Sequence, residues 1–178
     1  MKKPIEAETD RLYLRQWRPT DCEPFAQMSA DPVVMEFFPG TLTRVESDAL
    51  ADRFKLQIEK QGWGFWPVES KVTNEFIGFV GLNALSNEFP FFPGVEIGWR
   101  LAFSEWGKSL AFEASKEALH IGFSLLGLNE IVSFTTIANR RSQALMKRLG
   151  MRESEIFDHP KLPHGHSLQR HCLYRLSH

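Results

Sequence analysis

The sequence contains few cysteines and tyrosines, two of each among 178 residues, and no long apolar run. No stretch approaches the 18 or so apolar residues of a membrane span, and the N-terminal MKKPIEAETD lacks the apolar centre of a signal peptide. Cys22 and Cys172 have no metal-binding spacing, so we expect two free thiols. These absences predict a soluble, cytoplasmic protein with no membrane partner.

The sequence also lacks a strong charge of either sign. Its formal net charge is -1, which provides no basic field for nucleic acid and argues against a partner held by bulk electrostatics. No repeat, low-complexity tract or linker divides it. We therefore expect one domain, residues 1–178, that buries roughly 70% of its unfolded surface and recognises a small or local ligand.

The N-terminal third predicts one strand followed by two helices. RLYLRQW, residues 11–17, alternates as a strand does. Thr20 with Glu23, and Thr43 with Glu46, have the spacing of a capping box, in which a hydroxyl and a carboxylate satisfy free helical amides. The first helix should end near residues 30–32.

The second predicted helix runs from about Thr43 to Lys60, and Gly62 should stop it. Its apolar residues recur at helical spacing and should face the core. They are Val45, Ala49, Leu50, Phe54 and Ile58.

The remaining segments alternate between strand and helix periods. Residues 62–70 and 75–85 predict a hairpin around KVTN, and residues 94–103 a third strand. Residues 107–126 predict a largely buried helix, 130–138 a strand, 139–150 a helix closed by Gly150, and 151–157 and 167–176 two late strands. The predicted order is β-α-α-β-β-β-α-β-α-β-β.

The segment WGKSLA, residues 106–111, lies between a predicted strand and the long helix. A helix N-terminus presents unpaired amides and partial positive charge, so a loop of small residues before it can bind an anion. Gly107, Ser109 and Ala111 would let a phosphate approach the backbone. Small residues also allow close packing on a sheet, and the segment alone favours neither interpretation.

The order of these segments resembles the GCN5-related N-acetyltransferase (GNAT) superfamily, and within it the RimJ/RimL-like branch of ribosomal-protein alanine acetyltransferases. The likeness extends from TDRLYLRQWRPTD through GWRLAF, WGKSLA and NRRSQALMKRLGM to HCLYRL. It implies an α/β (α+β) fold with a mixed, mostly antiparallel twisted sheet flanked by helices. Ser109 departs from the family pattern, in which a glycine is usual.

The resemblance implies acetyl-CoA as co-substrate and no metal. Backbone groups of Trp99, Arg100 and Leu101 would hold the pantetheine arm and the acetyl carbonyl. Asn139 would contact the pantetheine region, and Ser142 lies one turn along the same helix face; Asn139 also suits a helix N-cap. The pyrophosphate would bind the loop formed by Trp106, Gly107, Lys108, Ser109, Leu110, Ala111 and Phe112.

Acetyl transfer to an amine needs a group that accepts the ammonium proton and one that supplies a proton to the leaving thiolate. Glu96 is the candidate base; it could equally be a structural carboxylate paired with an arginine or an amide. Many relatives have a tyrosine seven residues after the asparagine, and here that position is Met146. Ser142 is therefore the candidate acid.

The acceptor is expected to be a primary amine, either a protein N-terminus or a small molecule. Loop aromatics that could line its site are Phe37, Phe38, Trp63, Phe65, Phe91 and Phe92, although core packing explains each one singly. A homodimer through the aromatic loops or the late strands is possible. Arg140 and Arg141 could meet the CoA 3′-phosphate or form a solvated helix face.

Four of the six histidines lie in residues 157–171, as His159, His164, His166 and His171. Nothing in their spacing supports a metal site, and a substrate-facing loop is favoured. A catalytically degenerate acyl-CoA sensor or scaffold remains an alternative, whereas a nucleotide-binding phosphate loop is excluded because its full motif is absent.

Overall fold

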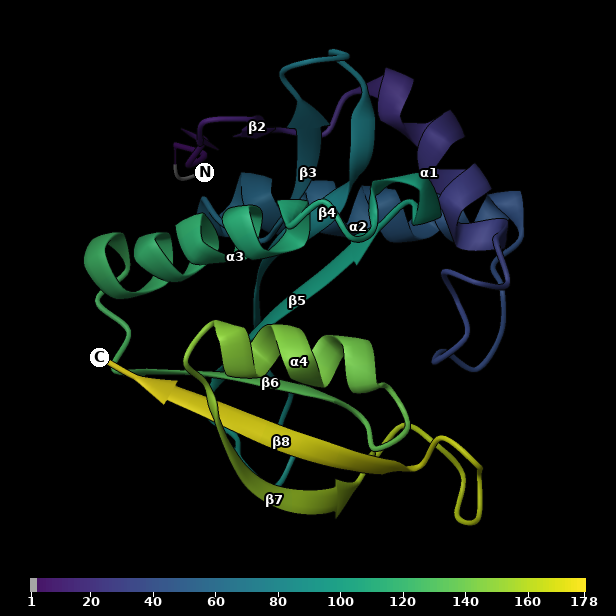
Figure 1. Ribbon diagram of the computed structural model, residues 1–178, viewed down its shortest axis with the longest axis vertical. Helices are drawn as coiled ribbons and strands as arrows, with labels where there is room; N and C mark the ends of the chain where they lie inside the picture. Colours follow the sequence, from purple (N-terminus) through teal and green to yellow (C-terminus); the bar gives the residue numbers. More distant parts are fainter. Residues whose placement is uncertain (1–2) are drawn as a thin grey trace.

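The computed structural model describes residues 3–178, which form a single eight-stranded sheet with four α-helices (Figure 1). The strands are β1 (Ala7–Glu8), β2 (Leu12–Leu14), β3 (Phe65–Ser70), β4 (Phe76–Ala84), β5 (Val95–Leu101), β6 (Glu130–Thr136), β7 (Arg152–Asp158) and β8 (Arg170–Ser177). The helices are α1 (Cys22–Ala30), α2 (Arg44–Gln61), α3 (Leu110–His120) and α4 (Arg140–Arg148).

The sheet has the order β1-β2-β3-β4-β5-β6-β8-β7. Neighbouring strands are antiparallel except β5 and β6, which are parallel because α3 carries the chain from one to the other. The predicted mixed, mostly antiparallel fold is confirmed. The predicted order lacked β1, whose two residues are too short for any periodicity, and the predicted strand 11–17 is confined to β2.

The helices lie on both faces of the sheet. Figure 1 shows α3 and α4 in front of it and α2 behind, with α1 packed against α2. The main core joins α1, α2 and α3 to β2–β5, and a smaller cluster around Phe89, Val132 and Leu173 lies against β6 and β8. Within residues 3–178, no helix combines the length and the apolar character needed to cross a membrane.

One of the two predicted capping boxes is present. Thr43 Oγ1 accepts from the amide of Glu46, whose carboxylate in turn accepts from the Thr43 amide at 2.7 Å, and Gly62 closes α2 at φ 89°. The Thr20–Glu23 box was wrong. A short 3₁₀ turn, Pro19–Asp21, precedes α1, and Asp21 accepts from the Arg18 amide at 2.8 Å.

The predicted inward face of α2 was partly wrong. Phe54 and Ile58 are buried, but Val45 is 78% exposed and Ala49 is also exposed. The buried face follows Ser47, Ala51, Phe54 and Ile58 instead. The prediction chose positions by apolar residue type, and the helix buries a small polar side chain in place of a valine.

The helix predicted from Gly107 begins three residues later, at Leu110, and its last residues adopt a wider helical turn. Residues 107–109 form a turn, and Ile121–Leu125 continue α3 as a π-helical segment. The prediction of a largely buried helix is wrong at Leu125, the last residue of this segment, which is 62% exposed. The later start leaves residues 106–109 as a loop in front of the α3 N-terminus.

Candidate functional site

Strands β5 and β6 diverge in the middle of the sheet. Their parallel pairing is confined to Glu96 opposite Val132, and Ser133 Oγ donates to the Ile97 carbonyl oxygen at 2.9 Å just beyond it. Beyond this pair, Trp99 to Leu101 pair with β4 on one side and have no strand pairing on the β6 side in the described chain, which leaves this edge of β5 open. An open strand edge exposes backbone donors and acceptors to a ligand.

Glu96 lies where this divergence begins and is held from the neighbouring strand. Asn83 Nδ2 donates to Glu96 Oε1 at 2.8 Å, and Gln57 Nε2 of α2 donates to Asn83 Oδ1 at 3.1 Å. Burial raises the pKa of the Glu96 carboxyl above its ordinary value, and the Asn83 hydrogen bond and the Lys161 charge oppose this only in part. A carboxylate of raised pKa accepts a proton more readily than an ordinary one.

The loop 106–109 turns the chain from β5 into α3 with two residues in the left-handed region. Gly107 has φ 75°, and a side chain added there would meet nothing within 4 Å, so the backbone is open to approach. Ser109 has φ 61°, the conformation for which a glycine is usual. Its hydroxyl accepts from Arg148 Nη1 of α4 at 2.9 Å.

The same loop is fixed from both sides. Trp106 Nε1 donates to the Leu101 carbonyl oxygen at 2.9 Å, so one lone pair of this backbone group is already used within the chain. Arg11 Nη1 donates to the Lys108 carbonyl oxygen at 3.0 Å and its guanidinium pairs with Glu113. Leu110, Ala111 and Phe112 form the first turn of α3 directly behind the loop.

Asn139 is the N-cap of α4, as its type and position predicted. Its Oδ1 accepts from the Ser142 amide at 3.2 Å, while its Nδ2 donates to Thr135 Oγ1 at 3.0 Å and to Ser142 Oγ at 3.1 Å. Asn139 and Ser142 are therefore brought together at the end of β6. Met146 is 1% exposed and belongs to the core.

The six aromatic candidates do not form one site. Phe65 packs with Phe54 and Phe79, and Phe91 with Phe134 and Phe157, so both belong to core clusters. Phe92 is 50% exposed, and Trp63 is half-buried against the main core. Phe37 lies near the Arg141 guanidinium, which also stacks on Trp106 and pairs with Glu36 at 2.7 Å.

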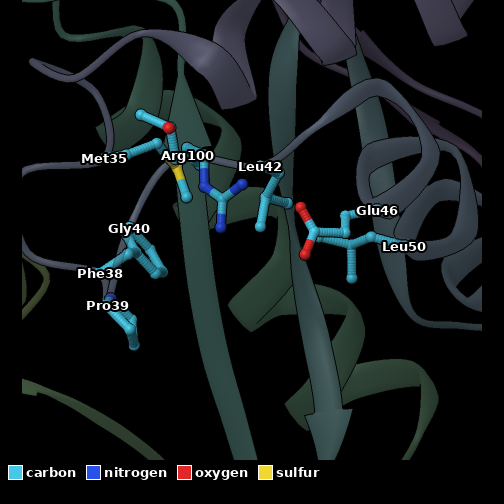
Figure 2. Close-up of a pocket in the computed structure, with 9 residues that line it drawn as sticks. Met35, Phe38, Pro39, Gly40, Leu42, Glu46, Leu50 and Arg100 are labelled. Carbon is cyan, nitrogen blue, oxygen red and sulfur yellow. The ribbon is translucent and has the colours of Figure 1, made fainter.

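Phe38 lies at a cavity of about 370 Å³ between the α1–α2 connection and β5. Figure 2 shows Arg100 projecting between Met35 and Phe38 on one side and Leu42 and Glu46 on the other. The sequence resemblance implies a role for the Arg100 backbone alone, and no sequence motif indicates that its side chain enters a cavity. The remaining lining residues are Pro39, Gly40, Thr41 and Leu50.

Two of the four clustered histidines face each other. The rings of His159 and His171 lie 4.7 Å apart beside Phe134, and burial with the neighbouring His171 lowers the pKa of His159 to about 4. Both therefore favour the neutral form at pH 7. Among residues 3–178, no three His, Cys, Asp or Glu side chains converge as metal ligands would.

The sequence model of one protein family, described as the acetyltransferase (GNAT) domain, matches residues 11–152. The chain belongs to the GNAT acetyltransferase family. It is similar to the uncharacterized N-acetyltransferase p20 of Bacillus licheniformis, 31% identical over 151 residues, 83% of each chain. It is also similar to the uncharacterized N-acetyltransferase YoaA of Bacillus subtilis, with 28% identity over 151 residues, 84% of each chain. These relatives support an N-acetyltransferase, an acyltransferase enzyme.

Solved structures agree in fold. A GNAT acetyltransferase from Bacillus anthracis superposes with a TM-score of 0.81 at 23% identity, over 97% of this chain and 98% of that one. A structure described as a ribosomal-protein-serine acetyltransferase from Vibrio cholerae gives 0.80 at 17% identity over the whole of both chains. The GNAT family generally uses acetyl-CoA, which fits an open loop before α3 and an open strand edge.

Proposed function

We propose that the chain, acting as one domain, transfers the acetyl group of acetyl-CoA to a primary amine by direct attack in a ternary complex. The observation that carries the proposal is Glu96, a carboxyl of raised pKa held by Asn83 where β5 and β6 part. The open edge of Trp99 to Leu101 is the proposed place of the pantetheine arm and the acetyl carbonyl. No metal takes part.

The loop of residues 106–112 is proposed to hold the pyrophosphate. Gly107 leaves the backbone accessible, and the α3 N-terminus adds partial positive charge. Ser109 occupies its left-handed position at a cost, and the Arg148 hydrogen bond offsets part of it. Arg148 thereby also places a cation beside this loop.

Glu96 acts as the general base. It accepts a proton from the ammonium of the acceptor, directly or through one water, and the neutral nitrogen then attacks the acetyl carbon. The tetrahedral species collapses with release of the CoA thiolate, which takes up the second proton that the nitrogen loses as it becomes an amide. Asn83 holds the Glu96 carboxylate in one orientation, and Gln57 holds Asn83.

Ser142 is the proposed thiolate stabiliser. Asn139 donates to its hydroxyl oxygen, which leaves the hydroxyl proton free to point to the departing sulfur. Met146, buried in the core, cannot perform this role. An unchanged rate in Ser142→Ala would remove Ser142 from the mechanism.

A thiol-release assay with acetyl-CoA tests the function against peptide N-termini, polyamines, amino acids and aminoglycosides. The RimJ/RimL-like branch suggests a protein N-terminus, but similar sequences also acetylate small amines, so the panel contains both classes. Release with one acceptor class, reduced 10²- to 10⁴-fold in Glu96→Gln and unchanged in the exposed Glu75→Gln, supports the proposal. CoA binding without release from any acceptor would instead indicate a sensor or scaffold.

A further inference from the structure

Arg100 is a buried cation without an acidic partner among residues 3–178. The residue is 8% exposed, and its side chain makes one long hydrogen bond, from Nη1 to Ser29 Oγ at 3.5 Å. Its Nε is buried and has no hydrogen-bond partner in the described chain. Burial lowers the pKa of Arg100 to about 10, which still leaves it charged at pH 7.

The guanidinium is positioned by aromatic rings. Its central carbon lies 4.3 Å from the centre of the Phe38 ring and 5.3 Å from that of Phe79. Such contacts stabilise a cation by a modest amount and leave its in-plane N–H groups unused. Nε and Nη2, which donate to no described residue, form the edge of a guanidinium that binds a carboxylate through two parallel hydrogen bonds.

This side chain enters the cavity bounded by the α1–α2 connection and the start of α2 (Figure 2). Glu46 is the acidic group that also lines it, and one of its oxygens accepts both the amide and the hydroxyl of Thr43 in the helix cap. The cap accordingly holds Glu46 at the helix N-terminus. No hydrogen bond joins it to Arg100 in the described chain.

Arg100 and Glu96 share one face of β5. The register pairs Asn83 with Glu96, Gly81 with Gly98 and Phe79 with Arg100, and alternate residues of a strand point the same way. Four residues of strand separate the two Cα atoms by about 13 Å. Gly98 lies between them without a side chain, and the Phe65 ring packs over it.

We infer that the Arg100 cavity binds a carboxylate of the acceptor, so that the preferred substrate carries an anionic group at a distance from its amine. The inference deepens the proposed transfer reaction and rests on it for the identity of the acceptor. An anion offsets the cost of a buried cation and satisfies the unpaired Nε, and Glu96 at the other end of the same face takes the proton from the amine. An acceptor amine without a carboxylate cannot make the contact with Arg100.

The test compares ω-amino acids of three to eight carbons with their ω-amino carboxamides in the thiol-release assay. At the best chain length the wild type should use the acid at least tenfold better in kcat/KM. Arg100→Met should remove this preference, and Arg53→Met, which deletes an exposed arginine of α2, should keep it. Equal rates for acid and amide in the wild type overturn the inference whether or not a variant folds.

A binding measurement separates this inference from the transfer reaction. Glutarate, a dicarboxylate without an amine, should raise the thermal midpoint of the wild type and of Arg53→Met, but not of Arg100→Met. Arg100→Lys, which keeps the charge without the paired donors, should show a smaller rise. A flat melting curve would reveal a failure of Arg100→Met to fold. In that case the inference requires a smaller glutarate-induced rise in the thermal midpoint for Arg100→Lys than for the wild type, and an equal rise overturns it.

Failure of the transferase proposal and failure of the carboxylate site give different results. Glutarate stabilisation without thiol release from any amine would support the carboxylate site and remove the transferase proposal. Release at equal rates from acids and amides, with no effect of glutarate, would leave the transferase and overturn the carboxylate site. Loss of CoA stabilisation in Arg100→Met, with no effect of glutarate on the wild type, would assign the guanidinium to CoA and likewise overturn the inference.

Discussion

Asn83 Nδ2 donates to Glu96 Oε1 at 2.8 Å across the pairing of β4 with β5. This hydrogen bond favours the charged carboxylate and works against burial, which favours the protonated acid. The two strands thus set the pKa of the proposed base between opposing influences. Changing either one should move the pH dependence of the reaction.

Removing the amide should move the activity profile to higher pH. Asn83→Ala deletes the hydrogen bond that lowers the pKa of Glu96, so the carboxyl should stay protonated to a higher pH and the rising limb of kcat/KM should move up. Gln57→Ala, one contact further away, should cause a smaller shift. A pH profile of thiol release checks both, and a profile unchanged in Asn83→Ala would exclude Glu96 as the titrating base.

Glu96 should also cost stability at neutral pH. Its folded-state pKa is raised, so the folded chain binds this proton more tightly than the unfolded chain does. The contribution to stability is present below the unfolded pKa and is lost as pH rises through the folded pKa. Glu96→Gln should therefore unfold at a higher temperature than the wild type at pH 8, and the gap should close at low pH.

The steric cost of the left-handed backbone at Ser109 can be measured with a matched pair of variants. Ser109→Ala and Ser109→Gly both lose the Arg148 hydrogen bond, but only glycine adopts φ 61° without a steric cost. Urea unfolding should find the glycine variant more stable than the alanine variant by about 1 kcal/mol. Equal stabilities would mean that the loop carries no strain.

Asn139 has separable roles in capping and in contacts of its amide nitrogen. Asn139→Ala should lose about 1 kcal/mol of unfolding free energy, because the Ser142 amide loses its acceptor. Asn139→Asp keeps that acceptor and removes the donor to Thr135 and Ser142. It should retain stability in urea yet raise the KM for acetyl-CoA; a KM equal to that of the wild type would limit Asn139 to its cap.

Restoring the usual tyrosine should harm the fold. Met146 is buried in the core, and a tyrosine there adds volume and a hydroxyl to a packed space. Met146→Tyr should lower the unfolding free energy by about 1–3 kcal/mol, whereas Met146→Leu should cost less than about 1.5 kcal/mol. A tyrosine variant as stable as the wild type, with a faster rate, would show that the position reaches the active site.

The sequence predicted the elements whose signals are local. The Thr43–Glu46 box, Gly62 and the hairpin around KVTN depend on neighbouring residues, and all three are present. Local signals were not sufficient everywhere, since the Thr20–Glu23 box is absent, and the buried face of α2 required tertiary information. Val45 has an apolar side chain at helical spacing, yet the direction of the α2 buried face depends on how the helix packs on the sheet.

The candidate site also contains some residues that local sequence signals identify and others that depend on tertiary contacts. Loop 106–109 and Asn139 were identifiable from short motifs and from the resemblance, and Ser109 lies at a left-handed position, where the family pattern has glycine. Asn83 and Arg148 were missed, because their contacts cross between elements whose register no local pattern gives. Alternation along β5 was the one available signal for Arg100, since it shares the face of Glu96.

The position of β8 in the sheet affects the order in which the protein can be completed during synthesis. Arg170–Ser177 lie between β6 and β7, so each of those strands waits for a partner that the ribosome makes later. Until residue 177 has left the exit tunnel, β6 and β7 both present unpaired edges, which are prone to pair with other chains. A nascent chain stalled before Arg170 should therefore need a chaperone to stay in solution.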